Sequence, residues 1–369
     1  MTTKKRILLA LSGGPDSAVA GALLRSQGFD LVGIHVAKGE LGQKICAGGV
    51  RRDPARVAKV LEIPLIHVDA AGLYEAEVID PLVHAAMQCY RPASCTCCHQ
   101  KVLIPALFKK VEELGLDGLA TGHYVKLHYD QLAQEVRLGR ASDLERDQSY
   151  LFAGVDLAHL SRMLAPLGDL TRHLTFRLLQ ESGLEDLARS KCPLEGAGAP
   201  AFSQGLVENR VAKSLFRPGI IRTKPGRVLS DHGGQYRYRV GQKIDLGSLT
   251  QGEEYFVLGV VPSQDAVVIG PRSELARSAF IANGAWWLRA NDELRGLECE
   301  IWFDPGVPLA PARVVFHSNQ TLTVELTMPV VGLEPGQVVV FYREGEVLGT
   351  ARVDPLQSAK WALASSTSI

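Results

Sequence analysis

Six residues near the N-terminus, Ser12-Gly-Gly-Pro-Asp-Ser17, join an apolar stretch to a helical pattern and limit the folds open to this chain. Gly13 and Gly14 can adopt positive φ and let the backbone approach a ligand closely. Successive N–H groups in such a turn form an anion site, and the helix behind it adds the positive end of its dipole. The run therefore predicts a phosphate-binding turn, although spacing alone also fits a tight strand–helix turn capped by a serine. Because no Gly-Lys-Ser or Gly-Lys-Thr follows, the Walker loop is excluded.

Apolar strand patterns alternate with helical patterns over about the first 200 residues. The expected strands are Arg6–Leu11, Leu31–Val36, Pro64–Val68 and Gly118–Thr121. The expected helices are Asp16–Gln27, Asp53–Leu61, Tyr74–Met87 and Gln100–Leu114. This alternation predicts an α/β fold with a parallel sheet covered by helices on both faces. Ligands bind such sheets at the carboxyl ends of the strands, where the glycine turn and the run Ala120–Tyr124 both fall.

The pattern changes after about Arg210, where short β-type runs rich in glycine and proline begin. Alternating strands at short spacing then predict a β-barrel or a sandwich. The expected organisation is a nucleotide-binding catalytic domain at 1–210, a small central β domain at 211–275, a C-terminal β-barrel at 276–356 and a tail at 357–369.

Charge and hydropathy exclude several classes of protein. The 40 basic and 40 acidic residues cancel, so a nucleic-acid partner would need a local basic patch. No stretch of the sequence reaches the roughly 20 apolar residues of a membrane helix. The short apolar run at the N-terminus enters the glycine turn, so it indicates a first strand and not a signal peptide. We therefore expect a soluble, cytoplasmic protein without a membrane partner.

Seven cysteines are spread unevenly, and Cys95, Cys97 and Cys98 fall within four residues. In a cytoplasmic chain this distribution favours catalysis or metal binding over a disulfide framework. Cys95 and Cys98 form a Cys-x-x-Cys that we expect just before a helix, a position that favours the thiolate. The spacing suits zinc or an iron–sulfur cluster, for which Cys192 is the candidate third ligand beside Cys46 and Cys89. The alternative is a set of buried, inert cysteines.

Taken in order, these motifs resemble those of the tRNA-specific 2-thiouridylase family along almost the whole chain. Residues 11–20 resemble the family's pyrophosphate loop, with Pro15 where valine is usual. Other matching segments are KICAGGVRRDPARVAKVLEIPLIHV, RPASCTCCHQKV, LATGHY, RDQSYLFAGV, YRYRVGQKIDLG and LEPGQVVVFYREGEVLGTARV. The resemblance implies a parallel-sheet pyrophosphate-loop domain, similar to the adenine nucleotide alpha hydrolases, followed by two small β domains.

The resemblance also implies a reaction. ATP adenylates the C2 oxygen of a wobble uridine in tRNA and releases pyrophosphate, and a cysteine persulfide sulfur then displaces AMP to leave 2-thiouridine. It implies ATP and Mg²⁺ as cofactors and tRNA as the partner. It also implies a sulfur donor, which would be a persulfide carrier protein or free sulfide.

By position, Cys98 matches the cysteine that acts on the nucleotide, Cys95 stands where an aspartate is common, and Asp16 would help to organise Mg–ATP. The residues at ATP-contacting positions are Leu11, Ser12, Gly13, Gly14, Asp16, Ser17, Val36 and Gly122. The residues at tRNA-contacting positions are His123, Arg146, Asp147, Gln148 and Gln337. From the residues alone, the histidine also fits a plain structural role, and Gln337 also fits a capped turn.

The chain departs from the family pattern in three places. The family's persulfide cysteine aligns with Ala199 or Pro200, His99 stands where asparagine is usual, and residues 301–316 lack the family's Arg-Tyr-Arg. Three explanations stay open. Cys95, Cys98 and Cys192 hold a [4Fe–4S] cluster with one open iron that delivers sulfide; Cys97 or Cys192 carries a persulfide without metal; or the chain is a divergent paralogue.

The sequence therefore predicts an ATP-dependent tRNA-uridine 2-sulfurtransferase, with Cys98 as the essential thiol and Cys95 and Cys192 as cluster partners. The alternative enzyme is a pyrophosphate-loop ATP pyrophosphatase that adenylates a different acceptor. The non-enzyme alternative is a tRNA-binding paralogue, against which the intact ATP loop argues.

Overall fold

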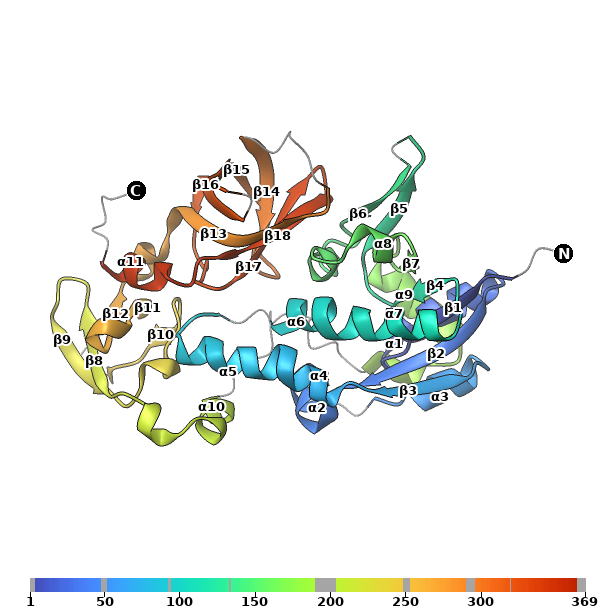
Figure 1. The fold of residues 1–369 in the computed structure, drawn as a ribbon, viewed down its shortest axis with the longest axis horizontal. Helices are drawn as coiled ribbons and strands as arrows, with labels where there is room; N and C mark the ends of the chain where they lie inside the picture. Colours follow the sequence, from blue (N-terminus) through green and yellow to red (C-terminus); the bar gives the residue numbers. More distant parts are fainter. Residues whose placement is uncertain are drawn as a thin grey trace. The chain divides into compact units, whose positions relative to one another are not determined.

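The structure is a computed structural model that describes residues 4–47, 52–91, 94–132, 134–189, 204–247, 253–289, 296–318 and 320–363. The chain forms two compact units (Figure 1). The first comprises Met1–Val78, Ser94–Pro200 and Glu344–Leu348, and the second comprises Ile79–Ala93, Ala201–Arg343 and Gly349–Ile369. No helix in the described part of the chain is long and apolar enough to cross a membrane.

A parallel sheet with the strand order β3-β2-β1-β4-β7 forms the core of the first unit. Its strands are β1 (Arg6–Ala10), β2 (Asp30–Ala37), β3 (Leu65–Asp69), β4 (Gly118–Ala120) and β7 (Met163–Leu164). Ile7, Leu8 and Leu9 of β1 are at most 3% exposed, because helices cover both faces of a parallel sheet. The predicted α/β class and all four predicted strands of this sheet are confirmed.

Helices connect and cover these strands. They are α1 (Pro15–Ser26), α2 (Gly39–Ala47), α3 (Pro54–Val60), α4 (Ala71–Tyr74), α6 (Ser94–Cys97), α7 (Ile104–Glu113), α8 (Leu157–Leu160) and α9 (Arg172–Glu181). Short π-helical or 3₁₀ turns are η1 (Glu75–Ile79), η2 (Cys98–Leu103), η3 (Ser149–Phe152) and η4 (Glu185–Arg189). Pro15 suits the first turn of α1, where an N–H would have no intrahelical acceptor, and Ala18, Val19 and Leu24 pack into the core.

Two predicted helices have different bounds in the structure. The expected helix Tyr74–Met87 is divided into the end of α4, the π-helical η1 and α5 (Asp80–Met87). The expected helix Gln100–Leu114 instead begins with α6 at Ser94 and continues through η2 into α7. No glycine or proline interrupts residues 94–99, so the helical run extends through them and includes Cys95 and Cys98.

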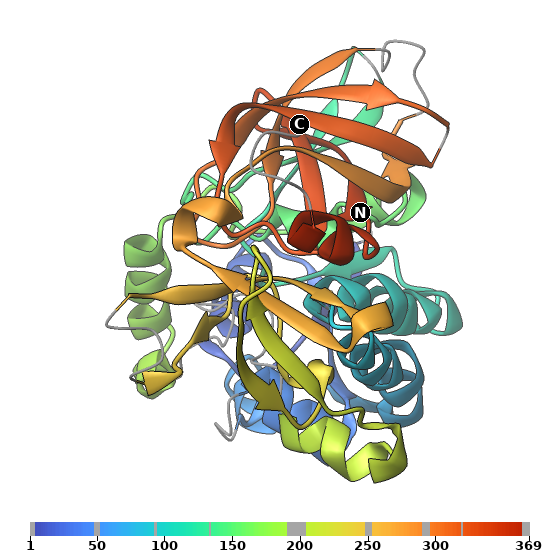
Figure 2. The ribbon, with the colours of Figure 1, turned by 90° about the vertical axis from the view of Figure 1, so that its left-hand side faces the viewer.

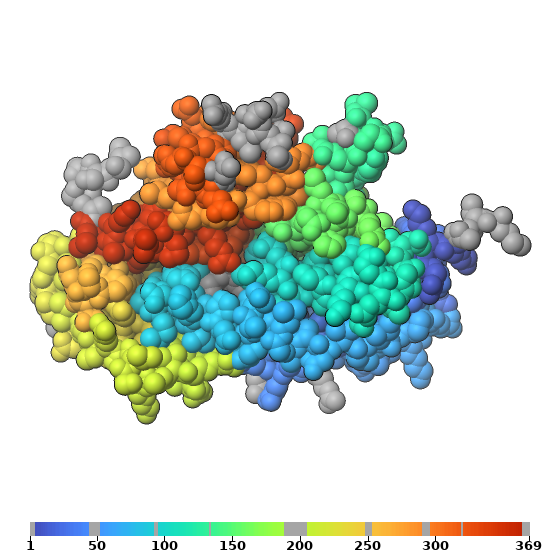
Figure 3. All heavy atoms as spheres, in the orientation of Figure 1, coloured from blue at the N-terminus to red at the C-terminus, as the bar shows by residue number. Residues whose placement is uncertain are grey.

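The β-hairpin of β5 (Lys126–Asp130) and β6 (Glu135–Gly139) was not predicted from the sequence. It projects from the body of the first unit (Figure 3). Arg137 stabilises it through ion pairs with Asp130 at 2.8 Å and with Glu346 at 3.0 Å. Gly139 pairs with Glu346, so the short segment 344–348 extends this hairpin within the same unit.

The second unit contains a small sheet with the order β10-β11-β12-β8-β9, which faces the viewer in Figure 2. Its strands are β8 (Gly219–Thr223), β9 (Val228–His232), β10 (Lys243–Ile244), β11 (Tyr255–Val261) and β12 (Ala266–Gly270). The strands β8 and β12 pair in parallel, and the other neighbours are antiparallel. Ala86 of α5, Val207 of α10 (Gln204–Arg210) and Tyr236 of η6 (Gln235–Arg237) form an apolar cluster in the same unit.

Six antiparallel strands follow in the described part of the chain, all in the second unit except residues 346–348 of β18. They are β13 (Arg277–Trp287), β14 (Leu297–Trp302), β15 (Ala310–Phe316), β16 (Thr321–Val330), β17 (Val338–Arg343) and β18 (Glu346–Val353). Pairing between β13 and β18 closes the sheet, as predicted for a β-barrel. The helix α11 (Gln357–Leu363) packs on β11, where Val260 N–H donates to Ser358 Oγ at 2.9 Å. Smaller 3₁₀ turns are η5 (Lys213–Leu215), η8 (Pro262–Gln264) and η9 (Arg272–Leu275).

Candidate active site

The glycine turn lies between β1 and α1, at the carboxyl end of the sheet, and packs against the start of α3. Gly13 has φ +76°, a left-handed conformation that strains other residues. A Cβ at Gly13 would lie 2.8 Å from the backbone nitrogens of Asp53 and Pro54. Both features require glycine here, so the turn has the tight backbone that the sequence predicts.

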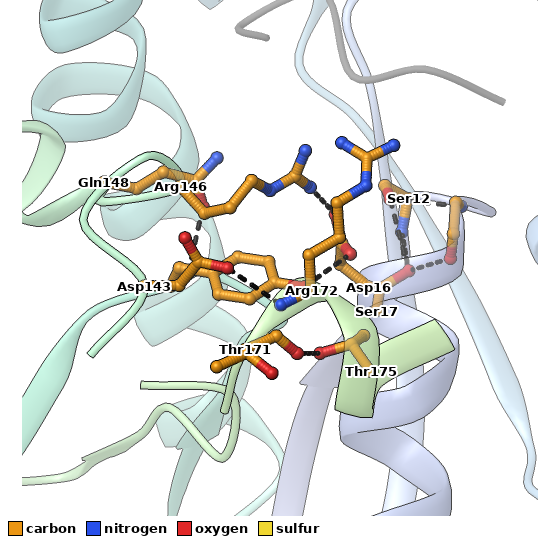
Figure 4. Close-up of polar contacts among 11 residues, drawn as sticks. Ser12, Asp16, Ser17, Asp143, Arg146, Gln148, Thr171, Arg172 and Thr175 are labelled. Atoms are coloured by element: carbon orange, nitrogen blue, oxygen red, sulfur yellow. Dashed lines mark hydrogen bonds and ion pairs between the residues drawn. The ribbon is translucent and has the colours of Figure 1, made fainter. Parts of the chain in front are cut away.

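Two serines hold the turn in shape (Figure 4). Ser17 is 5% exposed and donates its hydroxyl to the carbonyl of Gly14 at 3.0 Å. It also accepts from Ser12 N–H at 3.3 Å, and the Ser12 hydroxyl accepts from Gly14 N–H at 3.3 Å. The backbone N–H groups of the first turn of α1 have no acceptors within the helix. The fixed turn and these donors make a favourable site for phosphate.

The carboxylate of Asp16 lies beside the turn, where it contacts Tyr124 and Arg146. Tyr124 donates its hydroxyl to Oδ1 at 3.3 Å, and Arg146 Nη2 lies 3.4 Å from Oδ2. Burial, together with the negative charge of Asp16, raises the pKa of Tyr124 to about 12, so its hydroxyl stays a donor at neutral pH. The Arg146 guanidinium stacks over Tyr124 at 5.0 Å from the ring centre, and its side chain is 9% exposed.

Arg52 is a further cation at the turn that the sequence analysis missed. A Cβ on Gly14 would lie 3.4 Å from Arg52 Nη1, so this guanidinium is directly beside the turn. Asp53 follows it and caps α3 by accepting from Arg56 N–H at 3.0 Å. The signal in the sequence was the basic pair directly before this helix start, within a segment that resembles the family.

The other two residues of the predicted tRNA-contacting segment 146–148 make internal contacts. The Asp147 carboxylate is 4% exposed and accepts from Arg140 Nε at 2.9 Å, from Ala141 N–H at 3.1 Å and from Ser149 N–H at 3.2 Å. Gln148 Oε1 accepts from Tyr124 N–H at 3.0 Å. These contacts attach the segment to the residues that follow β4.

Gly122 and His123 follow β4 and connect the glycine turn to the cysteine segment. A Cβ on Gly122 would lie 2.6 Å from Asp16 C and from Ser17 N, so only glycine allows this close approach. The next residue, His123, places its Nε2 atom 3.0 Å from Nε2 of His99. The ring of Phe152 packs edge-on against both histidines. The structure thus brings the predicted residues Ser12–Ser17, Gly122 and His123 together.

The cysteine segment is largely enclosed. Cys97 and Cys98 are 8% and 3% exposed, whereas Cys95 is half-buried. Because residues three apart in a helical run share one face, Cys95 and Cys98 can act on a common ligand. His99 Nδ1 lies 2.9 Å from the carbonyl oxygen of Cys95 and donates to it. Among the described residues, no group of three or more His, Cys, Asp or Glu side chains is arranged to hold a metal ion.

The remaining predicted residues lie elsewhere. Val36 is near the end of β2, and Leu11 follows β1 and donates its N–H to Ile34 at 2.8 Å. Gln337, in the second unit, is 3% exposed; it donates to the carbonyl of Phe303 and accepts from Glu334 N–H. Cys192 lies outside the described residues, as does the side chain of Cys46.

Comparison with known proteins identifies similar sequences over nearly the whole chain. Residues 5–192 match the model of the tRNA methyl transferase HUP domain, and residues 277–353 match that of the aminomethyltransferase β-barrel domain. The tRNA-specific 2-thiouridylase of Rhodospirillum centenum is 33% identical over 357 residues, which cover 93% of this chain and 90% of the relative. That of Sorangium cellulosum is 32% identical and covers 94% and 92% of the two chains.

Solved structures resemble the chain only weakly. A 4-thiouridine synthetase in complex with RNA and bound ATP is 16% identical, with a TM-score of 0.34. The match covers 56% of this chain and 49% of that protein, which is too weak to support an inference.

Proposed function

The chain belongs to the tRNA-specific 2-thiouridylase family, and from this premise we propose a role for each site residue in the reaction of a tRNA-uridine 2-sulfurtransferase. The observation that carries the proposal is the contact made by two successive residues. Gly122 touches the glycine turn, and His123 touches the histidine next to Cys98. A base held at this point would have a phosphate site on one side and a thiol on the other.

The glycine turn is the proposed ATP site. Gly13, Gly14 and Ser17 would hold the departing pyrophosphate through backbone N–H groups and the start of α1. Arg52 and Arg146 would neutralise the negative charge that develops there as the C2 oxygen attacks the α-phosphorus. Asp16, a hard oxygen ligand at the same place, fits Mg²⁺ bound together with the phosphates. Leu11, Ser12, Val36 and Gly122 complete the proposed nucleotide contacts.

Cys98 is the proposed thiol of the second half-reaction. A sulfur atom, either a free sulfide or the outer sulfur of a Cys98 persulfide, adds to C2 of the adenylated uracil; the bond from C2 to the adenylate oxygen breaks, and AMP leaves with that oxygen and its electron pair. In the persulfide case a second thiol then attacks Cys98 Sγ, breaks the S–S bond to the nucleotide and forms a disulfide with Cys98, which releases the 2-thiouridine. Cys98 is 3% exposed, so the reacting carbon would be shielded from competing water. The sulfur comes from a donor outside the chain, either a persulfide carrier protein or free sulfide.

Cys95, Cys98 and Cys192 are the residues that would hold a [4Fe–4S] cluster. Cys95 and Cys98 are three residues apart in one helical run, a spacing that favours a shared face, and Cys192 lies outside the described residues. Such a cluster would supply one iron without a protein ligand, able to bind a sulfide. A cluster there would replace the persulfide cysteine that the resemblance leads us to expect at residue 199 or 200.

The same family membership supports tRNA as the substrate and a cytoplasmic location. His123 and the segment Arg146–Gln148 border the proposed base site, so tRNA contact there would couple substrate binding to the nucleotide loop. The side chain of Gln337 is buried, so we propose that it affects tRNA binding indirectly, by fixing the shape of its turn.

Release of pyrophosphate and AMP from ATP is the first test. The assay would use the full chain with no tRNA, with a transcript that has an unmodified wobble uridine, and with the same transcript carrying wobble cytidine. It does not depend on the sulfur source. We expect release with the uridine transcript only; release that ignores tRNA would indicate another acceptor, and no release would indicate a binding protein.

A further inference from the structure

His99, which is buried, and His123, which is half-buried, form a pair whose hydrogen-bond roles can be assigned. The two Nε2 atoms are 3.0 Å apart, so one hydrogen lies between them. On the other side of the pair, His99 Nδ1 is 2.9 Å from the carbonyl oxygen of Cys95. A carbonyl oxygen only accepts, so Nδ1 of His99 carries a hydrogen.

Both rings are neutral in this environment, because His99 is only 7% exposed and Nδ1 of His123 is also buried. A charge enclosed in this way without a compensating partner would be unfavourable. A neutral His99 with hydrogen on Nδ1 has a lone pair on Nε2, which accepts the Nε2–H of His123.

The remaining ring nitrogen of His123 is therefore an acceptor. A neutral imidazole with hydrogen on Nε2 has its lone pair on Nδ1. This Nδ1 atom is buried and has no hydrogen-bond partner among the residues that the structure describes. A buried acceptor without a donor is unfavourable, so the site lacks one donor that a bound molecule could bring.

We propose that His99 is a positioning residue that fixes His123 in this tautomer, so that His123 Nδ1 accepts the N3–H of the target uracil. The inference rests on the proposed function. In uracil, N3–H is bonded directly to the reacting C2, so a donor is next to the carbon that the site must reach. In cytosine, N3 is itself an acceptor, and two lone pairs would face each other. The pair thus selects uracil by excluding cytosine.

The position of the pair supports this assignment. His123 follows Gly122, which contacts the glycine turn, and His99 follows Cys98. The two hydrogen-bonded rings therefore lie between the glycine turn and Cys98. The proposed mechanism places C2 of the uracil in this same region, between the phosphate and the thiol.

The tautomer can be measured directly by NMR on the full chain labelled with ¹⁵N-histidine. We expect His123 to show a protonated Nε2 and an unprotonated Nδ1. His99→Gln places an amide oxygen near the former Nε2 position and should preserve this signature. The asparagine of His99→Asn is shorter, so its amide can replace only the ring nitrogen nearer Cys95. This variant should lose the tautomer signature of His123. A protonated Nδ1 in the wild-type protein would overturn the proposal.

Substrate selection is the second readout. Dissociation constants would be measured for tRNA transcripts with wobble uridine, cytidine or 3-deazauridine, in which C–H replaces N3–H without added bulk. An ATP analogue that is not cleaved between its α and β phosphates would be present. We expect uridine to bind about 10-fold more tightly than 3-deazauridine, the value of one hydrogen bond of about 1.4 kcal/mol. His99→Gln should keep this ratio, and His99→Asn should bring it close to one.

The controls separate this inference from the proposed function. His159→Gln changes an exposed histidine paired with Asp156 and should keep the wild-type ratio. A purely structural role for His99 would weaken binding of all three transcripts equally and would refute the inference. Equal binding of uridine and 3-deazauridine by the wild-type protein would also refute it. Failure to bind any of the three transcripts would instead overturn the proposed function. The assignment of the uracil N3–H as the donor to His123 would then be overturned as well.

Discussion

Nη2 of Arg146 lies 3.4 Å from Oδ2 of Asp16, although 130 residues separate the two in sequence. The segment that follows β6 therefore supplies a cation directly to the glycine turn. Tyr124 completes the contact, since it donates to the other carboxylate oxygen and lies under the guanidinium. The resemblance to known relatives assigns Arg146 to tRNA, whereas its observed partners belong to the proposed nucleotide site.

Replacing Arg146 should therefore affect ATP first. We expect Arg146→Gln to raise the dissociation constant of Mg–ATP about 10-fold, the usual effect of losing one charge-assisted contact of about 1.5 kcal/mol. Arg146→Lys should recover part of this loss, because lysine keeps the charge but not the planar stack on Tyr124. Calorimetric titration of the tRNA-free protein measures both constants.

A double-mutant cycle with Asp16→Asn tests whether the contact carries the effect. The two substitutions should be non-additive, because each removes the same pair. Arg25→Gln, which removes an exposed pair with Glu62, is the matched control and should bind ATP normally. An Arg146→Gln protein with normal ATP affinity and weakened tRNA binding would contradict this account.

Gly122 offers a second test of the same turn. Gly122→Ala would put a methyl group 2.6 Å from the backbone at Asp16 and Ser17 and displace the start of α1. We expect ATP-dependent pyrophosphate release to fall at least 100-fold, since small misplacements of reacting groups have effects of about this size. Gly72→Ala is the matched control, because a Cβ there meets nothing within 4 Å. Equal activity of the two variants would show that the turn tolerates displacement.

The cysteines are predicted to fall into two classes, those needed for thiolation or iron binding and those needed for neither. Cys98→Ser should abolish thiolation and leave ATP binding intact, because the thiol acts after adenylation. If a cluster is held as proposed, iron in anaerobically purified protein should fall sharply in Cys95→Ser, Cys98→Ser and Cys192→Ser. Burial raises the pKa of Cys299 to about 12, so this thiol stays protonated and Cys299→Ala should retain the iron. Wild-type protein without iron would exclude the cluster and favour a persulfide on Cys97 or Cys192.

The sequence predicted local features well and distant contacts poorly. The turn from Ser12 to Ser17 was readable because its glycines and serines act on neighbouring backbone groups. Arg52 and the pairing of His99 with His123 depend on how separate loops meet at the sheet edge, which residue spacing does not encode. The hairpin of β5 and β6 was missed because its strands interrupt an otherwise regular strand–helix alternation. The helical run begins at Ser94, earlier than predicted, because the cysteine-rich residues 95–98 are themselves helical.

Glu334 gives a pH-dependent prediction for the second unit. Its carboxylate lies 2.9 Å from Arg91 Nη1, which also contacts Asp304 at 2.8 Å. Burial raises the pKa of Glu334 above its usual value of 4.5, against the opposing effect of Arg91. The folded state therefore keeps a proton over a pH range in which the unfolded chain has released it.

In that range, which begins near pH 4.5 and ends at the raised pKa, the free energy of unfolding should fall as pH increases. Glu334→Gln keeps a carbonyl acceptor for Arg91 but has no proton to release, so its unfolding free energy should change less with pH. The gain over wild type should be largest above the raised pKa, where the wild-type carboxylate is charged and buried. Denaturant unfolding followed by the fluorescence of the β-barrel tryptophans at a series of pH values measures this. Parallel curves for the two proteins would mean that Arg91 fully compensates the buried charge.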